Sequence, residues 1–457
     1  MADVLRLADI SQGTTVDLLS GTMQLIDNTW MTQTPGEEYD YNKVPFGAVP
    51  SFKNFSAVQE TMDLLGNDTS VNVRSGVNSI EDVLEGARLY HSNELHETSY
   101  WLEWNADGES AKRSLLYTGA MQYPLSVGVN QFLPNNRLVG RLTMTRHPLW
   151  ETTTATTISS SGVSCSGGMW QITGVPGTAP ARLSSFSADW GTGGSSDIAE
   201  LWVGIRPDYY GRSGFDPVWP VENGTAATDT SVSSGAMYTT FATDETMTKR
   251  FEVSVDDVIS SDYNHMIGRY LVLARAKVAA ADTVVGVQMA AGYISAGFRT
   301  PSAARYIDGK TGYHLLELGY IQIPSAGVYY GQPADAARRY CIELRAEHIE
   351  GTQGLYIDSF YLIPSEHFLY INGVSVVTNN PAWAVVKEND AVHIGGYWGA
   401  YQANAVGSAI DWYLPVGASV LVIAGQDDIA EAAPHSLTNN LDLSIDYYPR
   451  WRSFRDS

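Results

Sequence analysis

From residue 151 to the end of the chain, no segment carries the 3.6-residue apolar period of a helix, and apolar side chains alternate with polar ones instead. A period of two places successive side chains on opposite faces of a strand, so one set is buried and the other faces solvent. The expected inward sets of two clear examples are Tyr340, Ile342, Leu344 and Ala346 in one strand and Leu441, Leu443, Ile445 and Tyr447 in another. The pattern predicts sandwich or jelly-roll sheets.

This strand-rich part is too long for one sandwich, because such domains usually run well under about 200 residues. The stretch 206–224, rich in Pro, Gly and polar residues, breaks the strand rhythm, and 363–373 breaks it again. They favour a sandwich built from 151–207 and 366–457 that carries 208–365 as an inserted jelly roll, since loop tips tolerate insertions. Two consecutive domains, cut near residue 220 or near residue 365, are the alternative.

The first 150 residues hold the one segment with a clear helical period, at 75–92. Ser79 or Asn78 is its expected N-cap, with an acidic residue three positions later in either case. The apolar residues that recur at i, i+3, i+4 and i+7 are Ile80, Val83, Leu84 and Ala87. The segment is therefore expected to lie with one apolar face on a sheet.

Strands surround this helix. In 99–124 the residues Tyr100, Leu102 and Trp104 share a face, and Asp107-Gly108 supplies a hairpin turn. The strand in 137–151 ends at Pro148, because proline cannot donate to a sheet ladder. Residues 1–150 are thus expected to form a sheet crossed by a single helix.

The negative net charge of the chain argues against nucleic acid as a partner. The formal net charge is −22, whereas nucleic-acid phosphate is bound by clustered Lys and Arg.

The chain has no apolar segment of signal-peptide length and no apolar run near twenty residues, so neither export by a signal nor membrane insertion is expected. Cys165 and Cys341 have neither a CxxC nor a zinc spacing, and we expect reduced thiols rather than a disulfide.

No catalytic motif is present: there is no GxGxxG before a helix, P-loop, HExxH or GxSxG. His91 and His96 lie five positions apart, which is not the i, i+4 spacing of two zinc ligands on one helical face. Asp358 is expected on the strand face opposite the core, where it is a solvated acid, a hydrogen-bond partner of a loop or, with Glu222, a structural calcium ligand. No catalytic residue, metal ligand or cofactor is assigned.

Aromatic side chains in predicted loops suggest a site for sugar, because pyranose faces stack on Trp and Tyr while a few polar groups fix the hydroxyls. The candidates in the expected inserted jelly roll are Tyr209, Tyr210, Trp219 and Tyr263. The alternative for each is packing within its loop.

The order of segments in the first half resembles the N-terminal half of distal tail proteins of long-tailed (siphovirus-like) bacteriophages. The resemblance rests on residues 70–91, 99–109, 115–124 and 137–151, the last ending in the basic-Pro-aromatic-Glu corner "RHPLWE". In that family a tail-tube-like β-sandwich with one α-helix ends in such a corner and is followed by a galectin-like β-sandwich.

The second half is similar to an elaborated member of the same family. Residues 172–186, 412–425 and 441–454 resemble the first and the last strands of the galectin-like sandwich. Segments within 208–365 resemble an inserted carbohydrate-binding-module-like β jelly roll, notably 267–278 and 355–364. The long Ser/Thr stretch at 152–162 departs from the family pattern. The expected fold class is accordingly mainly β.

The resemblance implies a structural role in the virion. Rings of the protein would cap the tail tube and bind the tail tube protein and tail tip or hub proteins, after assembly in the host cytoplasm. DNA would pass through the channel without specific binding, and the jelly roll would contact host cell-surface polysaccharide. Two other classes stay open: a glycan-binding adhesion protein of the virion, and a polysaccharide-cleaving enzyme with two carboxylates roughly 5–9.5 Å apart.

Overall fold

A computed structural model describes most of the chain. The described residues are 3–11, 13–26, 37–44, 47–92, 98–106, 109–122, 137–190, 198–208, 217–221, 225–227, 236–241, 246–254, 266–293, 300–323, 340–372, 382–386, 392–395, 406–410, 413–427 and 440–453. Contacts divide the chain into two units. Unit 1 consists of Met1–Thr156, Pro176–Ala181 and Tyr448–Ser457, and unit 2 of Thr157–Val175 and Arg182–Tyr447.

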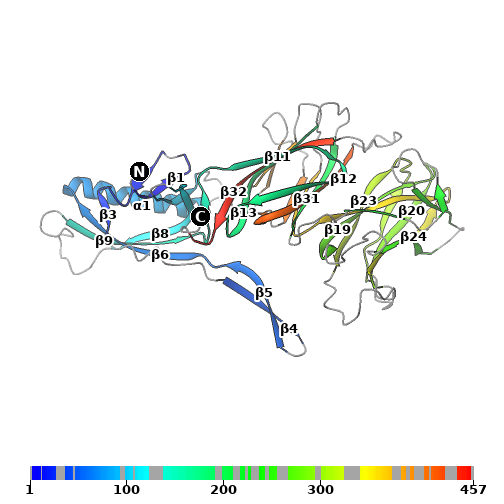
Figure 1. The fold of residues 1–457 in the computed structure, drawn as a ribbon, viewed down its shortest axis with the longest axis horizontal. Coiled ribbons are helices and arrows are strands. Elements are labelled where there is room, and N and C mark those ends of the chain that lie inside the picture. Colours follow the sequence, from blue (N-terminus) through cyan, green and yellow to red (C-terminus); the bar gives the residue numbers. More distant parts are fainter. Residues whose placement is uncertain are drawn as a thin grey trace. The chain divides into compact units, whose positions relative to one another are not determined.

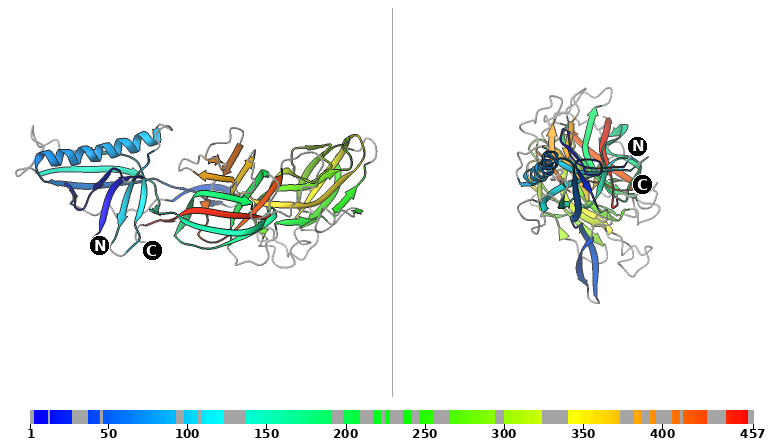
Figure 2. Two further views of the ribbon diagram at one scale, coloured as in Figure 1. Left: turned by 90° about the horizontal axis from the view of Figure 1, so that it is seen from above. Right: turned by 90° about the vertical axis from the view of Figure 1, so that its left-hand side faces the viewer.

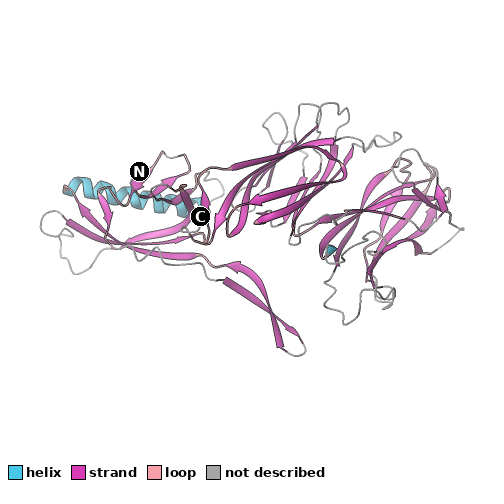
Figure 3. Ribbon diagram, viewed as in Figure 1, coloured by secondary structure: helices cyan, strands magenta, loops and turns pink. Residues whose placement is uncertain are grey.

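The fold is mainly β, as the alternation predicted, and Figure 3 shows strands almost throughout. In the described residues the one α-helix is α1 (Ser70–Ser92). No helix among the described residues combines the length and the apolar character needed to cross a membrane.

Unit 1 is built on antiparallel strands. The first run of neighbours is β2-β1-β7-β8, and the sheet continues from β8 through β9 and β6 to β3. The bounds are β1 (Val4–Asp9), β2 (Thr15–Asp17), β3 (Met23–Leu25), β6 (Val58–Asn67), β7 (Tyr100–Asn105), β8 (Lys112–Gln122) and β9 (Arg137–Arg146). Strand β9 ends two residues before Pro148, as expected.

Helix α1 packs on this sheet, and Figure 2 shows it lying along one side of the strands. The predicted apolar face is confirmed, since the core of unit 1 contains Ile80, Val83, Leu84 and Ala87. The predicted N-cap is wrong, because the helix begins at residue 70, and Val73 and Val77 extend the same buried face. Thr69 precedes the first turn, and its hydroxyl accepts a hydrogen bond from the backbone N–H of Asn72 (3.3 Å).

One hairpin of unit 1 stands apart from the larger sheet. Strands β4 (Glu37–Val44) and β5 (Gly47–Phe55) pair with each other and, among the described strands, with no third strand. In Figure 1 the pair extends away from β6, the strand that follows it in the chain.

Short strands complete unit 1. Strand β10 (Trp150–Thr152) pairs with β8 on one side and with the end of β32 (Asn440–Trp451) on the other. The carbonyl of Arg450 accepts the backbone N–H of Thr178 (3.0 Å). The segment "RHPLWE" therefore turns the chain from β9 into a strand that pairs with the C-terminal strand.

In unit 2, one sheet has the order β12-β31-β14-β26-β29. Strands β13, β27 and β28 are neighbours in that order, β30 pairs with β13, and β11 pairs with the first part of β32. The bounds are β11 (Thr156–Ser164), β12 (Ser166–Val175), β13 (Ala179–Trp190), β14 (Ile198–Pro207), β26 (His367–Asn372), β27 (Ala382–Val386), β28 (Val392–Gly395), β29 (Val406–Ile410), β30 (Tyr413–Leu414) and β31 (Gly417–Asp427). The predicted inward residues of β32 are confirmed as buried: Leu441, Leu443, Ile445 and Tyr447.

Two further sheets of unit 2 form a second sandwich. Their orders are β16-β17-β25-β19-β23, with β15 on β25, and β18-β24-β20-β21, with β22 on β20. The bounds are β15 (Val218–Pro220), β16 (Thr225–Ala227), β17 (Ala236–Thr239), β18 (Thr248–Ser254), β19 (Gly268–Val278), β20 (Val284–Tyr293), β21 (Thr300–Pro301), β22 (Arg305–Asp308), β23 (His314–Ile323), β24 (Tyr340–Glu350) and β25 (Leu355–Pro364).

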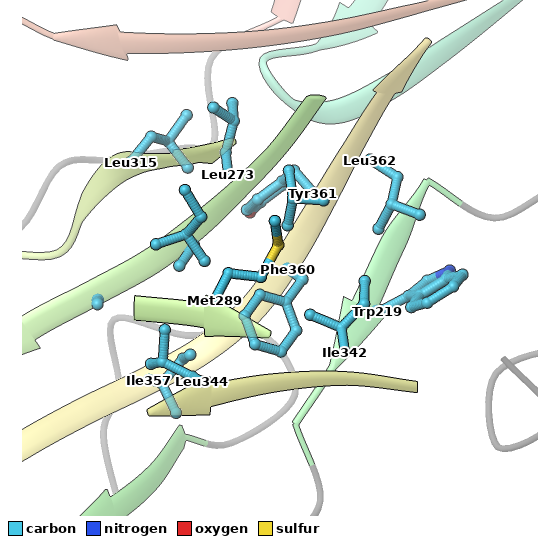
Figure 4. Close-up of a cluster of buried hydrophobic side chains, with 14 of the residues drawn as sticks. Trp219, Leu273, Met289, Leu315, Ile342, Leu344, Ile357, Phe360, Tyr361 and Leu362 are labelled. Atoms are coloured by element: carbon cyan, nitrogen blue, oxygen red, sulfur yellow. The ribbon is translucent and has the colours of Figure 1, made fainter. Parts of the chain in front are cut away.

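The core of this sandwich lies between its two sheets, and Figure 4 shows part of it. Ile342 and Leu344 of β24 and Met289 of β20 meet Leu273 of β19 and Phe360 of β25 in one buried cluster. The predicted inward set of β24 is confirmed, because Tyr340, Ile342, Leu344 and Ala346 all belong to this cluster.

The strands between 218 and 364 pair only among themselves in the described part of the chain, and the strands before and after this segment pair with one another. Contacts nevertheless keep the whole of Arg182–Tyr447 in one unit, and they add Pro176–Ala181 and Tyr448–Ser457 to unit 1. The boundaries at 150, 207 and 365 stay predictions.

Candidate functional site

The corner that ends β9 is held by a buried ion pair. Arg146 donates from Nη2 and Nε to Oε1 of Glu60 on β6, at 2.7 and 3.0 Å, and the two side chains are 2% and 1% exposed. Its Nη1 donates to the carbonyl of His147 (3.0 Å), and the guanidinium lies over the ring of Trp150 (4.7 Å to the centroid). The arginine thus ties β6 to the corner and to the start of β10.

Burial opposes the charges of this pair. It raises the pKa of Glu60 above the ordinary value, while the nearby Arg146 charge and its hydrogen bonds act in the opposite direction. Burial also lowers the pKa of Arg146, again against its partner's charge. Within the described residues, Oε2 of Glu60 has no hydrogen-bond partner. Desolvation therefore outweighs mutual attraction on both sides of the pair.

A second buried carboxylate joins three strands at the same corner. Glu151 of β10 accepts hydrogen bonds from Nε and Nη2 of Arg113 on β8 (both 3.3 Å) and from Nε of Arg450 on β32 (3.4 Å). The Arg113 guanidinium lies over the ring of Trp101 (4.1 Å to the centroid). The "RHPLWE" segment therefore links several strands of unit 1. Its Arg146 and Glu151 form ion pairs with side chains on strands that are far away in the sequence.

The predicted sugar-binding residues are mostly outside the described residues. Tyr209, Tyr210 and Tyr263 lie there, and their role stays a prediction. Trp219 is described, and its expected position in a loop is wrong: it lies in β15, paired with Phe360 of β25, and is 0% exposed. It belongs to the buried apolar cluster drawn in part in Figure 4, and with 0% exposure its ring faces do not reach solvent.

Asp358 is buried rather than solvated, and the expectation that it lies on the open face is wrong. Its Oδ2 accepts a hydrogen bond from Nη1 of Arg275 on the neighbouring strand (2.6 Å). The register between β19 and β25 shifts at this point, so Asp358 is an extra residue between the paired positions 357 and 359. Its charge is balanced by Arg275, and Glu222, the other proposed calcium ligand, lies outside the described residues.

The two cysteines and His91 contact other parts of the fold and form no site together in the described residues. Cys165 and Cys341 are buried thiols that form no disulfide, as expected. His91 lies in the last turn of α1, and its Nε2 lies 3.0 Å from the carbonyl oxygen of Leu116. Burial lowers its pKa. His96 lies outside the described residues, and in the described part of the chain no group of three metal-ligating side chains is found.

Sequence reasoning missed the buried charges of unit 1. Glu60 and Arg113 lie on strands with otherwise ordinary alternation, and their partners are 86 and 38 positions away. The one local signal is the "RHPLWE" segment itself, whose Arg146 and Glu151 both prove to be buried.

Neither a family model nor a curated protein matches the sequence. Among solved structures, the chain is similar to the Dit protein (gp 19.1) of phage SPP1, described as a paradigm of the hub adsorption apparatus of phages that infect Gram-positive bacteria. That match has 10% identity and a TM-score of 0.27, and it covers 45% of this chain and 71% of the other.

A chain of the phage p2 baseplate in its activated conformation matches with 10% identity and a TM-score of 0.24, covering 78% of this chain and 98% of the other. The CBM22-1 xylan-binding domain of Paenibacillus barcinonensis Xyn10C matches with 13% identity and a TM-score of 0.19, covering 37% and 97%. TM-scores below 0.5 assign neither fold nor function to this chain.

Proposed function

We propose that the chain is a structural protein of a bacteriophage tail, in which unit 1 forms a homo-oligomeric ring at the distal end of the tail tube. The sequence order and the "RHPLWE" corner support this function through their resemblance to distal tail proteins. In the structure a sheet with one helix precedes the corner, and two strand-rich sandwiches follow it.

The observation that carries self-assembly is the β4–β5 hairpin. An isolated two-stranded hairpin is at best marginally stable in water, and its strand edges carry unpaired backbone donors and acceptors. Among the described strands, β4 and β5 have no further neighbour. A second copy of unit 1 placed against the hairpin supplies those missing contacts, and repetition of one such contact around an axis closes a ring.

The mass of the native full-length protein, measured by light scattering and paired with negative-stain imaging, tests this function. A closed oligomer with a central hole is expected. Replacing residues 38–54 by a short Gly-Ser turn should give a monomer that stays folded, with a far-UV circular dichroism spectrum like that of the wild type. A matched control is Tyr320→Ala in unit 2, which should leave the ring intact. A monomeric wild-type protein, or rings formed without the hairpin, contradicts the proposal.

In the virion this function places the protein next to the tail tube protein on one side and tail tip or hub proteins on the other, after assembly in the host cytoplasm. DNA passes through the ring without specific contacts, since a chain of net charge −22 repels phosphate. The role requires no cofactor and no catalytic step.

The second sandwich of unit 2 favours an additional role, which is to bind a glycan of the host surface. Its two-sheet architecture agrees with the carbohydrate-binding-module-like jelly roll that the sequence resembles. A chain that binds glycan but forms no ring would be an adhesion protein of the virion. Release of reducing sugar from the bound polysaccharide would instead indicate the third class, a polysaccharide-cleaving enzyme.

A further inference from the structure

Strand β32, drawn in red in Figure 1, contributes residues to both units. Residues 440–447 belong to unit 2, where they pair with β11 and β13. From Tyr448 onward the chain belongs to unit 1. We call residues 448–452 the strap. They follow the whole of unit 2 in the sequence, and Arg450 lies 299 positions after Glu151, its ion-pair partner in unit 1.

One side of the strap pairs with β10, the short strand of the "RHPLWE" corner. The paired positions are Trp150 with Trp451 and Glu151 with Arg450. The other edge of β10 pairs with β8, also at two positions. Without the strap, this three-residue strand loses half of its ladder, and its open edge becomes a template for wrong pairing.

The other side of the strap packs against residues 177–178. The carbonyl of Arg450 accepts the backbone N–H of Thr178 (3.0 Å), and the backbone N–H of Arg452 donates to Oγ1 of Thr178 (2.9 Å). A Cβ atom added at Gly177, whose φ is +122°, would lie 2.3 Å from the carbonyl oxygen of Arg450. The strap therefore fills a place that unit 1 provides for it on both sides.

Side chains of the strap also cover two buried cations of β8. The ring of Trp451 lies under the ammonium of Lys112 (4.7 Å from Nζ to the centroid), and the ring of Tyr448 lies 5.1 Å from the guanidinium of Arg113. Lys112 and Arg113 are 5% and 4% exposed. Arg450 brings a second cation to Glu151. The charged corner of unit 1 is thus complete only when the strap is in place.

The position of the strap is fixed from the other end of the same strand. In residues 440–447 the buried side chains alternate with more exposed ones. A slip of one residue would turn the buried set of unit 2 to solvent, so its packing sets the register of the whole strand. Correct pairing of the strap with β10 therefore follows the folding of β32 into unit 2.

We propose that the strap controls self-assembly: unit 1 becomes competent to join a ring only after the strap has paired with β10. Because the strap is synthesised after all of unit 2, chains that lack finished sandwiches do not enter a ring. A closed ring needs the same contact surface on every copy, so one incomplete chain would stop its closure. The assembly step rests on the ring function proposed above, whereas the dependence of β10 on the strap does not.

Hydrogen exchange followed by mass spectrometry tests the dependence within unit 1. The variant is the chain stopped after Tyr447, and peptides from β8 and β10 should exchange at least about tenfold faster than in the full chain. Peptides from β24 of unit 2 should be unchanged. The double variant Arg450→Ala/Trp451→Ala keeps the chain length and should accelerate exchange of β10 in the same direction.

The matched control is Asn440→Ala, which changes an exposed residue at the other end of β32 and should exchange like wild type. Co-expression tests the assembly step. A His-tagged chain stopped after Tyr447 is made together with untagged full-length protein, and rings are isolated by size. The tag should be absent from the rings, whereas a tagged Asn440→Ala chain should be present in them.

The outcomes separate the strap from the ring. Wild-type exchange rates for β8 and β10 in the stopped chain overturn the role of the strap, and so does incorporation of the stopped chain into rings. Faster exchange throughout unit 2 would also overturn it, since the loss would then be general unfolding. If the wild type forms no ring, the ring function and the assembly step are both wrong, while the exchange rates still decide whether β10 depends on the strap.

Discussion

Replacing the buried pair of Glu60 and Arg146 by apolar residues should cost little, whereas removing one partner should cost much. Glu60→Leu leaves the Arg146 guanidinium, 2% exposed, without its carboxylate. An uncompensated buried charge of this kind costs about 3–5 kcal/mol. For a unit of this size each kcal/mol lowers the melting temperature by about 2–4 °C, so a decrease of about 6–20 °C is expected.

The double variant Glu60→Leu/Arg146→Met removes both charges and keeps most of the volume. Burial shifts the pKa of each partner toward its neutral form, and one oxygen of Glu60 lacks a hydrogen-bond partner in the described residues. The desolvation penalty of such a pair is not repaid by its attraction. We therefore expect the double variant to lie within about 1 kcal/mol of wild type or above it, with a coupling energy of at least about 2 kcal/mol.

Scanning calorimetry of the full-length protein follows this effect, because it separates the transitions of independently folding units. The affected transition should be the one that also shifts when Thr69, the N-cap of α1, is replaced by Ala. A double variant as unstable as Glu60→Leu alone would refute the reasoning, since its instability would then come from lost packing and not from an unpaired charge. A wild-type-like Glu60→Leu would refute it equally.

Three further outcomes follow from the same structure. Burial raises the folded-state pKa of Glu60, so the contribution of this group to stability is complete below its ordinary pKa near 4.5 and is lost as pH rises through the folded value. The difference in urea-unfolding free energy between wild type and Glu60→Gln should therefore fall from pH 4.5 to pH 7.5. A difference that rises over this range would contradict the raised pKa. Trp219→Ala should lower the stability of unit 2 by about 3–5 kcal/mol in thermal unfolding, because the ring is 0% exposed, and a surface role predicts no such loss. Thr69→Ala should destabilise unit 1 by about 1 kcal/mol through loss of its cap, measured by the same method, whereas Ser79→Ala should have little effect.

Local periodicity predicted the strands and the inward faces because both depend on neighbouring residues. The alternation in β24 and β32 places the expected side chains in the core. It failed at Asp358, where a shift in the pairing of β25 with β19 adds one residue and reverses the face. A bulge depends on the partner strand, and nothing in the sequence "LYIDSFYLIP" marks it.

The start of helix α1 was predicted wrongly because the local sequence signal is weak there. Its buried face was evident from Ile80 to Ala87, where charged residues fill the gaps between apolar ones. In the first turns Val73 and Val77 stand beside an exposed valine, Val71, which blurs the apolar period. Ser79 resembles an N-cap in the sequence, but its hydroxyl donates to the carbonyl of Ser75 (2.9 Å) inside the helix. A helix N-cap can be predicted from a sequence only after the apolar face of the helix that follows it has been identified.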